Sequence, residues 1–272
     1  MPPLALGDVL SRLTVLAVAA ALLAGCATRP PADDAEALAE FEQVNDPFEP
    51  ANRVVFRFNE VLDDAAIEPA ARGYRRLVPA FGRDRVGDFI TNLRAPLIFG
   101  SQVLQGHLSG AATTAGRFAI NTTFGVLGIM DVASRMGLRH QEEDFGQTLA
   151  VWGIGEGPYL VLPFFGPSNP RDTVGLAVEW VADPFAVWAR GTNTDWFQPS
   201  RTGVATIDYR EANLELFDEI ERSSLDYYSS LRSLYRQRRS SLIANGAGVA
   251  GFDVPGADAF ESGDRSSPQQ QK

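Results

Sequence analysis

Residues 49–65 read EPANRVVFRFNEVLDDA, and this stretch decides the fold class. Its apolar side chains recur at spacings of three and four residues, the period of one face of an α-helix. They are Ala51, Val54, Val55, Phe58, Val61, Leu62 and Ala65. Polar side chains fall on the opposite face, so the stretch predicts an amphipathic helix that begins near Pro50 and ends before Pro69.

Further helical patterns follow along the chain. Residues from about 205 to 241 form a second long amphipathic pattern, in which acidic side chains give way to arginines as the helix dipole favours. Residues 85–105 and 171–188 are richer in apolar side chains and are also expected to be helical. Short strands of alternating pattern do not occur in series, so we predict an all-α protein.

The apolar segment from Pro158 to Phe165 resembles a strand, but its prolines are expected to keep it bent or extended instead. It carries no charge, so it either lies in the core or faces lipid. Burial is the usual outcome for such a run. Tryptophans suit both settings, because one end of the side chain is apolar and the other polar. The candidates for a membrane-facing position are Phe164, Phe165, Trp180 and Trp188.

Near the start of the chain, an apolar run from Leu13 to Leu23 ends in Ala24-Gly25-Cys26. The run has the length of the apolar region of a secretory signal peptide and is too short to span a bilayer. Cys26 is the single cysteine of the chain, so an internal disulfide is excluded. We expect residues 1–25 to be a cleaved signal peptide and Cys26 to be lipidated; the alternative is a buried helix with a stray cysteine. The residue after it is Ala27 and not Asp, which resembles an outer-membrane sorting signal.

The chain of 272 residues is acidic, with a net charge of -10. Removing residues 1–25 takes away one acid and one base, so the charge is unchanged. Acidity argues against nucleic acid as a partner and against simple electrostatic attraction to anionic lipids. We predict a lipidated tether over residues 26–44, one helical domain over residues 45–246 and a disordered tail over residues 247–272.

The sequence lacks the patterns of common enzymes. Its two histidines are His107 and His140, and neither a Gly-x-Ser-x-Gly nor a His-Glu-x-x-His pattern is present. His140 precedes Gln-Glu-Glu-Asp, which is expected to be a solvated acidic loop and not a metal site. We therefore expect no catalytic residue, no metal and no cofactor.

Several longer motifs resemble the MlaA/VacJ family and come in the family's order. They are Asn45-Asp46-Pro47-Phe48-Glu49, the stretch from Asn52 to Asn59, the stretch from Phe118 to Gly125, Asp131-Val132-Ala133, the stretch from Asp144 to Leu149, Trp152-Gly153, the stretch from Gly157 to Pro163, Gly166-Pro167-Ser168 and Arg171-Asp172. The resemblance covers the chain from about Asn45 to Gly246.

The resemblance implies an outer-membrane lipoprotein, anchored on the periplasmic face. Its helical domain would form a ring lying in one membrane leaflet, with a central passage for phospholipids. Such a protein would remove phospholipids that have strayed into the outer leaflet and hand them to a soluble periplasmic carrier protein. Family members also associate with trimeric outer-membrane porins, and no cofactor is needed. The alternative is a periplasmic scaffold that binds an outer-membrane protein and transports nothing.

The resemblance also suggests which residues act. We expect Asn52, Arg53 and Asn59, with the neighbouring Phe58, to order the ring or line its passage. We expect the segment from Gly125 to Gly128 to form a mobile turn near the passage. The plainer interpretation is that the asparagines and the arginine cap helices or pair with nearby acids, and that the glycines allow close packing.

Overall fold

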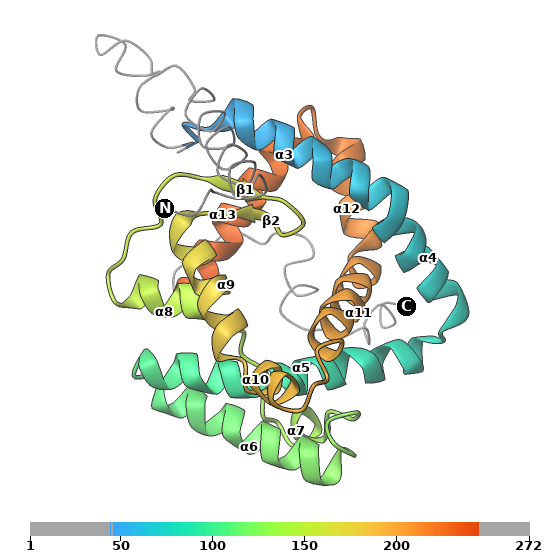
Figure 1. Ribbon diagram of the computed structural model, residues 1–272, viewed down its shortest axis with the longest axis vertical. Coiled ribbons are helices and arrows are strands. Elements are labelled where there is room, and N and C mark those ends of the chain that lie inside the picture. The colour runs from blue at the N-terminus through green and yellow to red at the C-terminus, as the bar shows by residue number, and fades with distance from the viewer. Residues whose placement is uncertain (1–43, 45, 245–272) are drawn as a thin grey trace, which may run out of the picture. The chain divides into compact units, whose positions relative to one another are not determined.

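Helices make up most of the chain between residues 46 and 244 (Figure 1). The structure is a computed structural model, and it describes residue 44 and residues 46–244. The all-α prediction is confirmed, since a two-stranded hairpin is the one sheet in the described residues. The predicted signal peptide, Cys26, the tether up to residue 43 and the tail over residues 247–272 lie outside the described residues.

The chain divides into two compact units. The first holds the described residues up to Val61 together with Glu156–Pro170. It contains nearly all of helix α3 (Glu49–Leu62) and the strands β1 (Leu160–Leu162) and β2 (Gly166–Ser168). The second holds Leu62–Gly155 and the chain from Arg171 onward, and so the other helices described below.

The first predicted helix is correct and α3 ends at Leu62, before Pro69, but the sequence did not predict that a further helix follows without a break. After α3 the chain continues through a π-helical turn, η1 (Asp63–Ile67), into α4 (Glu68–Leu77). Pro69 lies in the first turn of α4, where the nitrogen of a proline needs no hydrogen-bond partner within the helix. The wider turn thus lets the helical run pass the proline.

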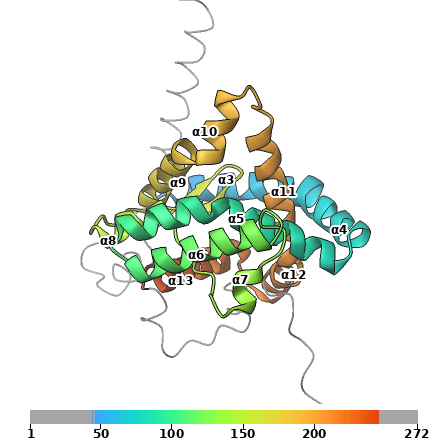
Figure 2. The same cartoon turned by 90° about the horizontal axis from the view of Figure 1, so that it is seen from below.

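Helices α5 (Ala80–Leu104) and α6 (Leu108–Phe124) lie side by side in both views (Figures 1 and 2). The prediction of a helix over residues 85–105 is thereby confirmed. Two short helices follow, α7 (Val132–Arg135) and α8 (Phe145–Val151). Asp131 and Asp144 cap their first turns by accepting hydrogen bonds from backbone N–H groups.

The last part of the second unit contains more breaks than the sequence predicts. Residues 171–188 are divided into α9 (Pro170–Ala182) and α10 (Pro184–Gly191), with Asp183 capping the second helix. The single helix predicted over residues 205–241 is wrong. The structure has α11 (Phe197–Ala212), α12 (Leu214–Ser223) and α13 (Tyr227–Ile243) instead. Asn213 leaves helical geometry between the first two, and an extended link from Ser224 to Asp226 separates the last two.

The expectation that the segment after Pro158 forms no strand is also wrong. Residues 160–162 pair antiparallel with residues 166–168, with Val161 opposite Pro167. A proline is tolerated here because β2 is an edge strand. Among the described residues, no further strand lies beside it in the sheet that would need a hydrogen bond from the missing N–H.

Polar and apolar side chains are distributed in an unusual way over the described residues. Buried polar or charged residues outnumber buried apolar ones, while many large apolar side chains are exposed. On α3 the buried residue is Asn52, whereas Val54 is 71% exposed and Phe58 and Val61 are about half exposed. Within the described part of the chain, helices long and apolar enough to cross a bilayer do not occur.

Candidate functional site

Asn52 fixes the hairpin of the first unit to α3. Its side chain is buried, and its Nδ2 donates to the carbonyl of Tyr159 at 3.0 Å and to the Asp46 carboxylate at 2.8 Å. Its Oδ1 accepts from the backbone N–H of Val161 at 2.9 Å. Every hydrogen bond places a buried polar atom opposite a partner, as burial requires.

Asn59 repeats this arrangement two helical turns further along α3. Its Nδ2 donates to the carbonyl of Leu162 at 2.9 Å, and its Oδ1 accepts from the N–H of Phe164 at 2.8 Å. Residues seven apart lie on the same helix face. A side-chain amide offers the same donor and acceptor as a peptide group. Each asparagine therefore binds one carbonyl and one N–H of the hairpin, as a peptide group would.

The residues predicted around this site divide into two groups. Asn52 and Asn59 both bind the hairpin. Phe58 makes an edge-to-face contact with Phe164 at the tip of the hairpin, with ring centroids 5.4 Å apart. Arg53 does not contact the hairpin through its Nε, which donates to Glu49 one turn earlier at 2.8 Å. That these residues order a ring or line a passage stays a prediction.

The four candidates for membrane-facing positions are all exposed. Phe164 and Phe165 lie at the turn of the hairpin, and Phe164 adopts a positive φ of 68°. Trp180 and Trp188 lie on α9 and α10 in the second unit. Trp188 makes an edge-to-face contact with Phe197. Their exposure is what lipid contact requires, and the contact itself stays a prediction.

The turn from Gly125 to Gly128 is closed by backbone hydrogen bonds. The N–H of Gly128 donates to the carbonyl of Asn121 at 2.9 Å, and that of Met130 donates to the carbonyl of Gly125 at 2.9 Å. A Cβ on Gly128 would clash with the side chain of Asn92, and its φ of 92° also favours glycine. The glycines thus have a packing role, while the predicted mobility of the turn stays untested.

Asp131 joins this turn to α6 and α7. It accepts from Arg117 at 2.7 Å, from Asn121 at 3.0 Å and from the N–H of Ser134 at 3.0 Å. Burial would raise the pKa of Asp131, but these hydrogen bonds outweigh it and lower the pKa to about 2. Two of the family-like motifs, Phe118–Gly125 and Asp131–Ala133, therefore meet in one structural network.

A second network, which sequence reasoning missed, surrounds Asp144. The Arg239 side chain of α13 donates to Asp144 and, at 2.9 Å, to Asp172 of α9. Tyr235 also donates to Asp172, at 2.6 Å. Burial opposes ionisation of Asp144, yet the Arg239 hydrogen bonds lower the pKa of Asp144 to about 2. Both acids lie in motifs that resemble the family, at Asp144 and at Arg171-Asp172. Their shared partner, Arg239 of α13, lies in none of these motifs.

The segment from His140 to Asp144 was expected to be a solvated acidic loop, and this is wrong. Glu143 is 3% exposed, and Arg238 and Arg239 pair with Glu142 and Asp144. Burial lowers the pKa of His140 to about 4, so the imidazole is neutral at pH 7. Gln105, directly after α5, and the two arginines of α13 pair with these acids, and a charge run alone does not reveal such partners.

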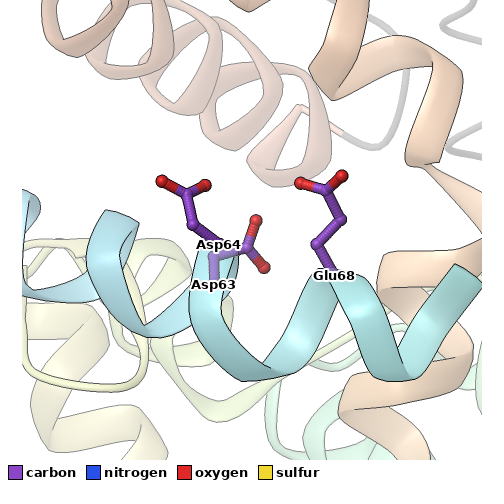
Figure 3. A group of neighbouring side chains, drawn as sticks. All are labelled: Asp63, Asp64 and Glu68. Atoms are coloured by element: carbon purple, nitrogen blue, oxygen red, sulfur yellow. The ribbon is translucent and has the colours of Figure 1, made fainter.

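Asp63, Asp64 and Glu68 form the one carboxylate group in the described residues close enough to suggest a cation site (Figure 3). The Arg210 guanidinium already pairs with Asp63 at 2.8 Å and with Glu68 at 3.2 Å. The π-helical turn explains how both acids reach it. The N–H of Glu68 donates to the carbonyl of Asp63 five residues earlier, which brings both residues to one face. The group is an ion-pair cluster between η1, α4 and α11.

Comparison with known proteins adds to this geometry. A family model described as MlaA lipoprotein matches residues 44–242. The chain is 32% identical over 256 residues to the intermembrane phospholipid transport system lipoprotein MlaA of Escherichia coli, covering 92% of this chain and 95% of that protein. The protein of the same name in Haemophilus influenzae is 33% identical over 238 residues, covering 86% and 90%. An uncharacterized protein of Rickettsia bellii is 37% identical over 202 residues, covering 74% and 78%.

A solved structure described as "Structural basis for maintenance of bacterial outer membrane lipid asymmetry" matches with a TM-score of 0.65 and 31% identity. The match covers 73% of this chain and 98% of that chain. The fold and the relatives together thus define a class of protein: helical lipoproteins of a lipid-transport system. The chain belongs to the MlaA lipoprotein family.

Proposed function

We propose that this protein is an outer-membrane lipoprotein that removes mislocalised phospholipids from the outer leaflet. It passes them to a soluble periplasmic carrier and so maintains lipid asymmetry. Relatives that cover nearly the whole chain are named as phospholipid transport lipoproteins. The observation that carries the proposal is the inverted distribution of side chains, with polar residues buried and large apolar ones exposed.

This distribution suits a protein whose surroundings are partly lipid. Exposed apolar side chains gain from contact with acyl chains, whereas buried polar groups stabilise a fold only when each has a partner. The asparagine contacts with the hairpin and the Asp131 and Asp144 networks supply such partners. The proposal includes no catalysis and no cofactor, because transfer of an intact lipid breaks no covalent bond.

The finer parts of the proposal come from the family. They are lipidation of Cys26, anchoring on the periplasmic face, a ring with a central passage and a trimeric porin as partner. They also include a role for Asn52, Arg53, Phe58, Asn59 and the Gly125–Gly128 turn in ordering the ring or lining its passage. Phe164, Phe165, Trp180 and Trp188 would face lipid. Phospholipid would enter from one leaflet only, because the protein would exclude lipids of the leaflet in which it lies.

The proposal is tested by phospholipid exposed in the outer leaflet of cells that lack this protein, measured by cleavage with added phospholipase. The intact gene should restore low exposure, and a Cys26→Ala copy should not. An Asn59→Leu copy should also fail, because it loses both hydrogen bonds to the hairpin tip. A Thr113→Val copy is the matched control, since Thr113 is only partly buried and its side chain bonds only within its own helix.

Unchanged exposure in the deletion strain would contradict the proposal. The alternative is a scaffold that binds an outer-membrane protein without moving lipid. In that case the deletion would lower the amount of the bound outer-membrane protein and leave outer-leaflet phospholipid as it was.

A further inference from the structure

The segment between α6 and α8 exposes a group of apolar side chains. They are Phe124, Val126, Leu127, Ile129 and Met136. Leu127 is 67% exposed, and residues 124–130 carry no charged side chain. Contiguous exposed apolar side chains mark a surface that contacts another molecule or a membrane.

The backbone of this segment is held in an uncommon conformation. Val126 and Leu127 have φ values of 54° and 58°, in the left-handed region that non-glycine residues rarely adopt. A β-branched residue such as Val126 is especially disfavoured there. The hydrogen bond from the Leu127 N–H to the carbonyl of Thr122, at 3.0 Å, helps hold the turn. The fold therefore keeps two apolar side chains exposed against local preference, as occurs at binding surfaces.

Two arginines follow the apolar turn. Arg135 ends α7, Arg139 lies four residues later, and both are exposed. Neither side chain has an ion pair or a hydrogen bond within the described residues. Arg117 of the neighbouring helix differs, since it is buried and pairs with Asp131. In a chain of net charge -10, two unpaired guanidinium groups that follow an apolar turn within 12 residues in the sequence form a local exception.

We propose that residues 124–139 form a phospholipid-contact surface. The apolar turn enters the acyl-chain region of the leaflet that holds the protein, and Arg135 and Arg139 bind the phosphates above it. A guanidinium group matches the geometry of a phosphate, and its long stem lets it reach the headgroup level from an apolar surface. A phospholipid layer presents acyl chains next to phosphates, which is the chemistry that exposed apolar side chains and free guanidinium groups together fit. The inference rests on the proposed function and assigns residues to its lipid contact.

The first experiment places a probe on the turn. The mature lipidated protein, with Leu127→Cys labelled by the fluorophore NBD, is reconstituted into phosphatidylcholine vesicles that contain acyl-chain spin-labelled phosphatidylcholine. Ser223→Cys, at the exposed end of α12, is the matched control. The parent protein, whose single cysteine is Cys26, gives the background labelling. Quenching at position 127 should exceed that at position 223 by at least about twofold, because an inserted side chain contacts acyl chains directly.

The second experiment tests the arginines. Arg135→Ser/Arg139→Ser in the labelled protein should reduce quenching at position 127, whereas Arg76→Ser/Arg222→Ser removes the same charge elsewhere and should leave it unchanged. Vesicles made of a galactolipid that itself carries the acyl-chain spin label contain no phosphate. In them, quenching at position 127 of the labelled protein with both arginines should fall to the level of the Arg135/Arg139 variant. Equal quenching at positions 127 and 223, or equal effects of the two arginine pairs, would overturn the proposal. A third outcome is that position 127 is not quenched in vesicles although Leu127 is required for phospholipid clearance in cells. That outcome would indicate a protein partner and would also overturn the proposal.

The outcome is separable from that of the proposed function. Strong quenching at position 127 in a protein that does not clear outer-leaflet phospholipid from cells supports this contact and contradicts the transport function. Normal clearance by cells carrying the Leu127→Ser copy, together with absent quenching in vesicles, overturns the contact and leaves the transport function standing.

Discussion

Glu143 lies in a polar layer between α5 and α8. One carboxylate oxygen accepts from the Gln105 Nε2 at 2.8 Å, and the other is buried without a hydrogen-bond partner. The charged or titratable groups that face it are His107, Asp144 and Arg239. Burial outweighs the attraction of His107 and Arg239 and raises the pKa of Glu143. A carboxyl group that favours its neutral form in the fold makes stability depend on pH.

We predict that the free energy of unfolding of the Glu143→Gln variant, relative to that of the parent, is higher at pH 7.5 than at pH 4.5. The folded state of the parent binds the Glu143 proton more tightly than the unfolded state. Its contribution is therefore complete below the ordinary glutamate pKa and is lost as the pH rises through the raised value. The variant does not titrate there, and each unit of pKa shift corresponds to about 1.4 kcal/mol. Urea unfolding of both proteins at the two pH values measures the difference, and an equal difference at both would contradict the prediction.

The elements of the fold differ in how far the sequence reveals them. Helix α3 follows from its apolar period, and α5 from the high proportion of apolar residues over 85–105. The break at Asp183-Pro184 carries a recognisable capping pair, which sequence reasoning passed over. The break at Asn213 has a weaker signal, because asparagine is tolerated in helices and favoured at their ends.

The hairpin could not be predicted from its own residues. A two-stranded hairpin is only marginally stable alone, and this one depends on Asn52 and Asn59, more than 100 residues earlier. Family resemblance marked the two asparagines, but nothing in the local sequence paired them with the carbonyls of Tyr159 and Leu162. Long-range pairing of this kind is set by tertiary packing.

Two substitutions in the turn after α6 are expected to stabilise the protein. Val126→Asn and Leu127→Asn should together raise the free energy of unfolding by about 1 kcal/mol, because asparagine tolerates the left-handed region better than either residue. Thermal unfolding measures the gain. The control is Val126→Ala/Leu127→Ala, which removes the apolar groups without supplying a residue suited to positive φ. An asparagine variant no more stable than the alanine variant would show that the turn carries no such strain.

Over the whole molecule, stability in acid is expected to depend on two partly buried, ion-paired aspartates from different parts of the chain. Asp131 and Asp144 both have a pKa lowered to about 2, so their contribution is complete above the ordinary aspartate value of 3.8. It is lost as the pH falls from there through about 2. This window lies below that of Glu143, so the effects are separable.

We predict that the midpoint of urea unfolding falls steeply between about pH 4 and pH 2 for the parent protein. Arg239→Gln should show a shallower fall, because Asp144 then loses the partner that lowers its pKa. The comparison requires only that the variant is folded at pH 5, where its lower starting stability is also measured. A fall as steep as that of the parent would mean that Asp144 does not drive the acid response.

The π-helical turn makes the spacing between α3 and α4 unusually sensitive to insertions and deletions. Asp63 and Glu68 reach Arg210 together because a hydrogen bond between residues five apart closes the turn there. Loss of a single residue would convert the segment to ordinary helix and rotate every residue of α4 by about 100° relative to Asp63. The ion pairs that Arg72 and Arg75 make with α11 and α12 would lose their alignment as well. Substitutions in η1 do not change the number of its residues. The length of η1 therefore constrains the protein more tightly than the identity of its residues does.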